Sequence, residues 1–222
     1  MPRIRRGLVK DGIYHVVSRG NGGQTVFLKP GDYQAFLKLM EESKKRFLLK
    51  IFAFCLMPNH LHFILCNIEE NIMSQWMQWL MTSHVQRYRR HYGGSGHVWQ
   101  GRFRSFLVEC DEYLLTVLRY VEANPVRAGL VRSAKEWPWS SHVRRIKNTL
   151  LGNEPDKSPI SLPVNWSDWV DRPLEDEELA RIRRSVNKQV PYGNDAWVLK
   201  ICEELGLQSV LRSRGRPKKG TG

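Results

Sequence analysis

Two histidines at the start of an apolar segment are the residues of this sequence best placed to do chemistry. His60 and His62 stand in MPNHLHFIL, directly after Pro58 and Asn59. If the segment is a β-strand, residues i and i+2 project from the same face, so the two imidazoles can converge on one point. Neutral imidazole is a common ligand of divalent metal ions. Taken alone, the pair leaves two interpretations open: half of a metal site, or hydrogen-bonded histidines in a protein core.

A predicted helix further along the chain carries polar side chains that could complement the histidines. Asp111 is a suitable N-cap, and the helix then runs to Pro125 with an apolar stripe. Tyr120 and Asn124 lie on neighbouring turns of one flank of this helix, and we expect them to face the edge of a sheet. Asn124 precedes a proline, so its side-chain carbonyl is free to turn toward a ligand. The alternative is that Tyr120 is a packing residue and Asn124 ends the helix.

The rest of the pattern predicts the elements that position these residues. Segment 13–18 is rich in β-branched and aromatic residues, which is typical of a strand. A helix over 32–47, a hairpin over 50–66, a helix over 72–92 and a strand over 103–110 follow, judged from their apolar periodicity. With the helix after Asp111, this order predicts an α+β fold, a ferredoxin-like or RRM-like split βαβ domain with an antiparallel sheet. We expect its helices to lie on one face of the sheet.

The composition indicates the kind of partner. The 222 residues include 35 Lys and Arg against 22 Asp and Glu, which gives a formal net charge of +13. Such a charge favours a polyanionic partner, and nucleic acid is the first candidate. There is no CxxC pair, no run of apolar residues long enough for a membrane span and no segment typical of a signal peptide. We therefore expect a cytoplasmic protein without a membrane partner.

The composition also changes along the chain. We expect residues 1–149 to form the domain that carries the histidines, and residues 150–172, rich in Pro, Ser, Asn and Asp, to be a linker that packs back onto it. Residues 173–210 are predicted to form a small helical extension with helices over 174–187 and 195–205. Residues 211–222 are a basic tail containing the sequence RGRP, which is the core of an AT-hook.

Three segments together resemble a known family. MPNHLHFIL, WQGRFRSF and YVEANPVRAGLV with the later WPWSS are similar to the single-tyrosine HUH transposases of bacterial insertion sequences, and specifically to the REP-associated tyrosine transposases. In that family the HUH motif is two histidines flanking a hydrophobic residue, here His60 and His62. The resemblance implies that Tyr120, four residues before the Asn of NPV, is the nucleophile. It also implies that Asn124 takes the place of a polar third metal ligand, which is often Gln in related transposases.

The resemblance implies a reaction and a cofactor. The protein would nick single-stranded or hairpin DNA rather than a regular duplex, through a 5′-phosphotyrosine link that a 3′-hydroxyl later reverses without ATP. The cofactor would be Mg or Mn, although histidine ligands alone would also suit Zn, Co or Ni. The enzyme could act as a monomer or a homodimer.

Several residues are candidates for contact with DNA. Trp99 could stack on unpaired bases, and the arginines could bind phosphate; the competing interpretation is a core residue for Trp99 and solvated charges for the others. The full set is Arg3, Arg5, Arg6, Trp99, Arg102, Arg104, Arg214 and Arg216.

Two other functions compete with the enzyme. One is a DNA-binding module or repressor that keeps the fold and the basic surface without chemistry. The other is a replication or plasmid-transfer initiator, which usually has other motif arrangements. The presence of Tyr120 together with His60 and His62 favours the enzyme.

Overall fold

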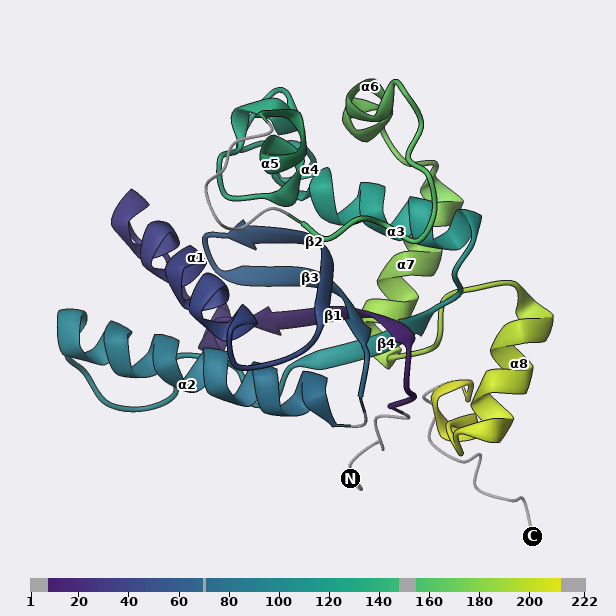
Figure 1. Ribbon diagram of the computed structural model, residues 1–222, viewed down its shortest axis with the longest axis horizontal. Coiled ribbons are helices and arrows are strands. Elements are labelled where there is room, and N and C mark those ends of the chain that lie inside the picture. The colour runs from purple at the N-terminus through teal and green to yellow at the C-terminus, as the bar shows by residue number, and fades with distance from the viewer. Residues whose placement is uncertain (1–7, 70, 148–154, 213–222) are drawn as a thin grey trace, which may run out of the picture.

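A computed structural model describes residues 8–69, 71–147 and 155–212 of the chain (Figure 1). Its elements follow one another as β1 (Gly12–Arg19), α1 (Pro30–Lys44), β2 (Lys50–Met57), β3 (His60–Asn67), α2 (Ile72–Tyr92), β4 (Arg104–Val108), α3 (Glu112–Glu122), α4 (Asn124–Arg127), α5 (Ser141–Lys147), α6 (Trp166–Asp171), α7 (Asp176–Lys188) and α8 (Asp195–Glu204). Short 3-10 turns lie at Asn21–Gly23, Ala134–Glu136 and Gln208–Val210.

The four strands form one antiparallel sheet in the order β2-β3-β1-β4. This order, with α1 and α2 as the two crossovers, confirms the predicted split βαβ domain. The hairpin of β2 and β3 turns at Pro58 and Asn59, so Met57 pairs with His60. Proline fixes φ and asparagine tolerates turn geometry, which is why the chain reverses at this point.

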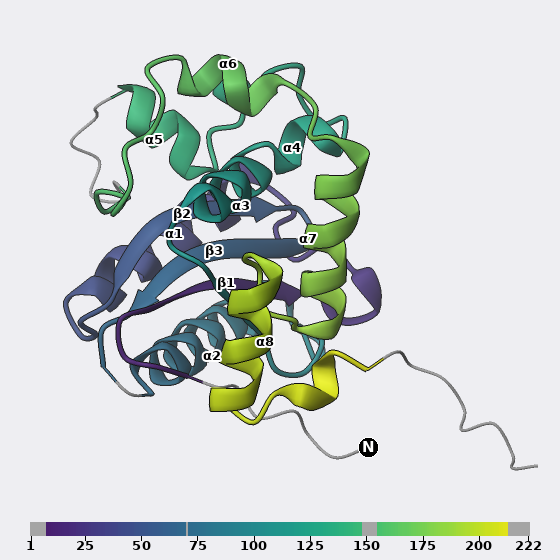
Figure 2. The same cartoon turned by 90° about the vertical axis from the view of Figure 1, so that its right-hand side faces the viewer.

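Helices cover both faces of the sheet, so the expectation of a single covered face is wrong (Figure 2). The face with Tyr14, Phe54 and Phe63 packs against α1 and α2, whereas the opposite face, with Cys55 and Ile64, packs against α3. The reason lies in the strands themselves. β2 and β3 are buried at nearly every position and carry apolar side chains on both faces, and strands of that kind need a packed layer on each side.

Both edges of the sheet are paired with other parts of the same chain. Along β2, the N–H of Leu56 donates to the carbonyl of Trp139 at 2.9 Å, and the N–H of Ile51 donates to Asp156 Oδ2 at 2.7 Å. Along β4, the N–H of Tyr192 donates to the carbonyl of Leu107 at 2.8 Å. Strand edges of this kind offer few unpaired backbone groups.

The C-terminal third of the chain contains helices where the sequence predicts them. α7 and α8 match the predicted helices, and Ile182 of α7 is fully buried in the core beneath α3. The predicted linker contains α6, whose Trp166 and Val170 join the same core. The division into domains stays a prediction. Among the residues that the structure describes, no helix has both the length and the apolar character needed to cross a membrane.

Candidate active site

His60 and His62 lie at the start of β3, next to the hairpin turn. Their side chains project from the face of the sheet that α3 covers. Their ring centroids are 5.0 Å apart. His62 is 3% exposed, whereas His60 is partly open to solvent. The i, i+2 spacing therefore places both imidazoles on one face, as the sequence predicts.

The hydrogen bonds of the two rings leave the same nitrogen free in each. Nδ1 of His60 lies 2.7 Å from Oδ1 of Asn59, whose own amide nitrogen donates to the carbonyl of Gly23. Nδ1 of His62 lies 2.9 Å from Nε2 of His15, a third histidine on β1. Within the described part of the chain, Nε2 of His60 and of His62 has no hydrogen-bond partner. Metal-ligating histidines commonly have this pattern, with one nitrogen held by a neighbour and the other free.

Burial and nearby cations keep both histidines neutral. Burial, followed by the charges of Arg19 and Arg127, lowers the pKa of His60 to about 4. Burial, the neighbouring imidazoles and Arg127 hold the pKa of His62 well below its usual range. A neutral imidazole has the lone pair that a metal ion requires, so both rings are in a form that can bind one at neutral pH.

Tyr120 lies over the centre of the sheet beside these histidines. Its ring centroid is 5.9 Å from that of His62 and 5.9 Å from that of His15, edge-on to both. The side chain is 6% exposed. Because His15 and His62 belong to the two central strands, the expectation that Tyr120 faces the sheet edge is wrong. The helix crosses above the sheet, because its apolar stripe belongs to a core cluster with residues of all four strands.

Arg127 covers the other side of the tyrosine ring, and the sequence analysis did not single it out. Its guanidinium carbon lies 4.1 Å from the Tyr120 ring centroid. Nη1 donates to the backbone carbonyl of Tyr120 at 3.3 Å, and Nη2 donates to Oδ1 of Asn124 at 2.6 Å. Arg127 follows Tyr120 by seven residues, and this two-turn spacing was the signal that could have identified it.

The side chain of Asn124 is engaged within its own helix region. Its amide nitrogen donates to the carbonyls of Tyr120 and Val121, at 3.0 and 3.3 Å, and its oxygen accepts from Arg127. A guanidinium at this oxygen counts against Asn124 as a metal ligand in this arrangement. The described residues also contain no cluster of three His, Cys, Asp or Glu side chains that could hold a metal ion. The donors present for a metal are therefore two imidazole nitrogens and, more weakly, one amide oxygen.

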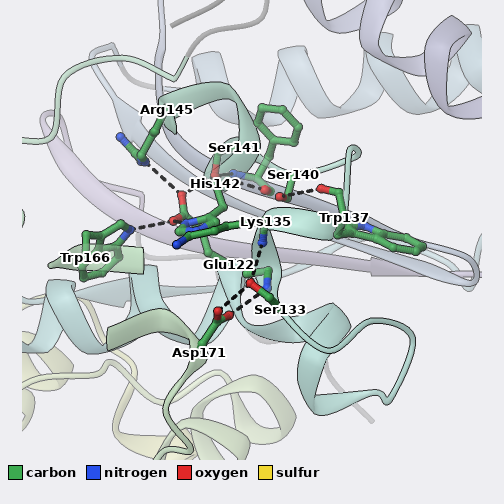
Figure 3. Close-up of polar contacts among 12 residues, drawn as sticks. Glu122, Ser133, Lys135, Trp137, Ser140, Ser141, His142, Arg145, Trp166 and Asp171 are labelled. Atoms are coloured by element: carbon green, nitrogen blue, oxygen red, sulfur yellow. Dashed lines mark hydrogen bonds and ion pairs between the residues drawn. The ribbon is translucent and has the colours of Figure 1, made fainter. Parts of the chain in front are cut away.

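A buried carboxylate, also missed in the sequence, holds the tyrosine helix in place. Figure 3 shows the side chains that converge on Glu122, two residues after Tyr120. The carboxylate accepts from Ser141 (2.6 Å) and Arg145 (3.0 Å) of α5, lies 2.9 Å from His142 Nδ1, and accepts from Trp166 (2.8 Å) of α6.

The ionisation of Glu122 follows from these partners. Burial on its own would raise the pKa of Glu122, but the charge of Arg145 and the hydrogen bond with His142 lower it to about 2. Glu122 is thus a charged anchor that fixes α3, and with it Tyr120, against α5 and α6. Breaking a buried ion pair of this kind is strongly destabilising.

The candidate DNA-binding residues differ in their exposure to solvent. Trp99 is 6% exposed and donates its indole N–H to Nδ1 of His84 at 3.2 Å, so the prediction that it stacks on bases is not supported. Arg102 and Arg104 are exposed. Arg104 pairs with Val17, which pairs with His62, so Arg104 projects from the face that carries the histidines. Outside the described residues lie Arg3, Arg5, Arg6, Arg214 and Arg216.

Comparison with known proteins identifies the family. Residues 8–124 match the family model described as "Transposase IS200 like". This segment contains both motif histidines, Tyr120 and Asn124, and it spans more than half of the chain. The chain belongs to the IS200-like transposase family.

Individual relatives agree with the predicted resemblance to REP-associated tyrosine transposases. A candidate REP-associated tyrosine transposase of Haemophilus influenzae is 28% identical over 173 residues, which cover 70% of this chain and 96% of that protein. The REP-associated tyrosine transposase of Escherichia coli is 23% identical over 169 residues, 75% of this chain and 92% of the relative. The fold is similar to the "Structure of the REP associates tyrosine transposase bound to a REP hairpin", with a TM-score of 0.57 at 20% identity over 79% of this chain and 100% of the other.

Proposed function

We propose that this protein is a metal-dependent enzyme that nicks and rejoins single-stranded or hairpin DNA, with Tyr120 as the nucleophile. The observation that carries the proposal is the position of the Tyr120 ring, 5.9 Å from the ring of His62 on the same face of the sheet. Membership of a transposase family supports DNA as the substrate. The solved relative bound to a REP hairpin supports palindromes of the REP type.

The nitrogen and oxygen donors at this site fit a divalent metal ion such as Mn²⁺ or Mg²⁺. His60 and His62 would hold it through their free Nε2 atoms, and Asn124 can join them only through the second lone pair of an oxygen that already accepts from Arg127. Water and a substrate phosphate would occupy the other positions, as is usual for Mg²⁺ and Mn²⁺. Imidazole donors favour Mn²⁺ of the two. When bound, the ion would polarise the scissile phosphate and stabilise charge on the leaving oxygen.

Tyr120 would form the covalent bond. Its phenolic oxygen attacks phosphorus and gives up its proton, the bond from phosphorus to the 3′ oxygen breaks, and the leaving oxygen takes a proton to become a 3′-hydroxyl. The 5′ phosphate stays on the tyrosine, and a 3′-hydroxyl from another strand reverses the step. A phenol is a weak nucleophile, so the attack needs positive charge beside the ring. Arg127, stacked on the ring, supplies that charge.

Arginines on the same face would hold the DNA backbone. Arg19 pairs with His60 across the strands, and Arg104 lies one strand beyond Val17. Both are exposed, as a phosphate contact requires. These positions place positive charge on β1 and β4, the two strands on one side of the histidine strand β3, and salt-dependent binding of DNA follows from it.

A labelled-DNA assay tests the reaction and its polarity. The protein is incubated with a hairpin oligonucleotide and Mn²⁺, and covalent adducts are separated on a denaturing gel. A 5′-phosphotyrosine link predicts that a label at the 3′ end moves with the protein, whereas a label at the 5′ end is released on a shorter strand. Chelation of the metal should abolish both products.

Matched variants test which tyrosine forms the covalent bond and whether the histidines are needed for cleavage. Tyr120→Phe should form no adduct, whereas Tyr113→Phe, on the same helix, should behave as wild type. The double variant with His60→Ala and His62→Ala should lose cleavage and keep most of its DNA binding. An adduct that survives Tyr120→Phe would remove Tyr120 from this role. Binding by every variant without any adduct would favour a DNA-binding module or repressor instead.

A further inference from the structure

His15 is a buried histidine that lies next to the motif without belonging to it. It stands on β1, is 0% exposed, and contacts Phe106 and Tyr120 edge-on at 4.9 and 5.9 Å between ring centroids. Its Nε2 lies 2.9 Å from Nδ1 of His62. The two ring planes differ by 9° and their centroids are 5.0 Å apart, which fits an in-plane hydrogen bond between ring edges.

One proton joins the two rings, and its position decides what His62 can bind. If Nδ1 of His62 carries the proton, Nε2 of His62 keeps its lone pair and can bind a metal ion. If Nε2 of His15 carries it, the proton of neutral His62 is on Nε2, which is then closed to a metal. In both cases Nδ1 of His15 is left buried without a partner. An unpaired buried polar atom is costly, so its retention calls for an explanation.

We propose that His15 is a positioning residue that accepts the Nδ1–H of His62 and so keeps the Nε2 lone pair of His62 directed toward the metal site. The proposal rests on the metal-dependent function proposed above. Asn59 has the equivalent position at His60, where an amide oxygen lies 2.7 Å from Nδ1. Each motif histidine then has its own hydrogen-bond acceptor, one from the hairpin turn and one from the neighbouring strand. His15 is not itself a ligand because its Nε2 is used by His62.

The tautomer of His62 tests this inference without any metal. Nitrogen-15 NMR of the metal-free protein should show His62 protonated at Nδ1 in the wild type. His15→Phe removes the acceptor while keeping a flat ring in the core, and the Nε2-protonated form of His62 should then appear. His15→Gln retains an acceptor oxygen and should keep the wild-type tautomer. A wild-type His62 protonated at Nε2 would overturn the inference.

Metal affinity gives a second measurement, independent of DNA cleavage. Mn²⁺ binding, followed by electron paramagnetic resonance, should weaken by about 10- to 100-fold in His15→Phe and by less than about 3-fold in His15→Gln. Phe106→Leu is the matched control, since it alters the packing around His15 and leaves the hydrogen bond in place; its Mn²⁺ affinity should match wild type. Wild-type affinity in His15→Phe, or equal losses in the Phe and Gln variants, would overturn the positioning role.

The two measurements separate this inference from the function on which it rests. If the wild type binds no Mn²⁺ but its His62 tautomer changes in His15→Phe, the metal-dependent function fails and the role of His15 in fixing the tautomer stands. If the wild type binds Mn²⁺ and neither quantity changes in the variant, the function stands and the inference fails. If His15→Phe does not fold, the His62 tautomer in the wild type and in His15→Gln still tests the inference.

Discussion

Arg127 contacts two of the residues proposed to take part in the reaction. It stacks on the tyrosine ring and donates to Asn124, so it connects the proposed nucleophile to the proposed third ligand. A planar guanidinium can cover an aromatic face and bind phosphate oxygens at once, whereas an ammonium group cannot do both.

Replacement of Arg127 should therefore slow the covalent step more than it weakens DNA binding. We expect Arg127→Ala to lower the initial rate of adduct formation by about 100-fold, the usual effect of removing one group that stabilises developing negative charge. Arg127→Lys should recover only part of the rate. Arg46→Ala is a matched control because Arg46 also stacks on an aromatic ring, that of Trp79, on the opposite side of the sheet. An unchanged rate in Arg127→Ala would contradict this role.

At the residue scale, the sequence predicts what depends on local spacing and misses what depends on pairing across strands. The convergence of His60 and His62 follows from the i, i+2 rule, and the structure confirms it. His15 could not be assigned, because its contact with His62 depends on the register of β1 against β3. The burial of Trp99 could not be predicted from the sequence either, because its hydrogen-bond partner His84 lies on a helix 15 residues earlier in the chain.

At the scale of elements, the contact of α2 with Trp99 makes the stability of this region depend on pH. Burial, opposed by the charge of Asp32 and assisted by that of Arg87, lowers the pKa of His84 to about 4. The unfolded chain takes up this proton below about pH 6.5, but the folded chain does not until about pH 4. The free energy of unfolding should therefore fall by about 1.4 kcal/mol for each pH unit in this interval, through His84 alone.

His84→Asn tests this dependence because asparagine keeps an acceptor for the Trp99 indole and does not titrate. In urea denaturation, the loss of unfolding free energy between pH 7 and pH 5 should be about 2 kcal/mol smaller in the variant than in the wild type. The same change at exposed His97 should leave the loss as it is in the wild type. Equal losses in His84→Asn and the wild type would contradict the burial argument.

Helices and strands were the most predictable part of this protein. Their apolar periodicity and the Pro58–Asn59 turn are local features, and the predicted order of elements agrees with the structure. The placement of α3 on the second face was not predicted, although β2 and β3 are apolar on both sides. Only the packing of the whole sheet decides which helix covers which face.

At the scale of the whole molecule, the proposed nucleophile and the motif histidines come from one chain. Both edges of the sheet are already paired within that chain, by Trp139 and Asp156 at β2 and by Tyr192 at β4. In the described part of the chain, both edges therefore offer a second copy few unpaired backbone groups with which to extend the sheet. We expect each subunit to hold a complete site.

Mixing two inactive variants tests this expectation. Tyr120→Phe combined with the double variant carrying His60→Ala and His62→Ala should form no adduct, because neither chain can lend its intact half to the other. Sedimentation should give the mass of one subunit, 26.0 kDa. Adduct in the mixture would show that sites are assembled from two chains.

The shared carboxylate of Glu122 has a consequence for how the protein opens. Because α3, α5 and α6 all hydrogen-bond through this one group, α3 cannot leave the sheet while the other two helices keep their buried partners satisfied. The three helices should therefore behave as one cooperative unit in native-state hydrogen exchange, with a common opening free energy. Fluctuations that expose the tyrosine would then be rare, all-or-none events rather than fraying of a single helix end.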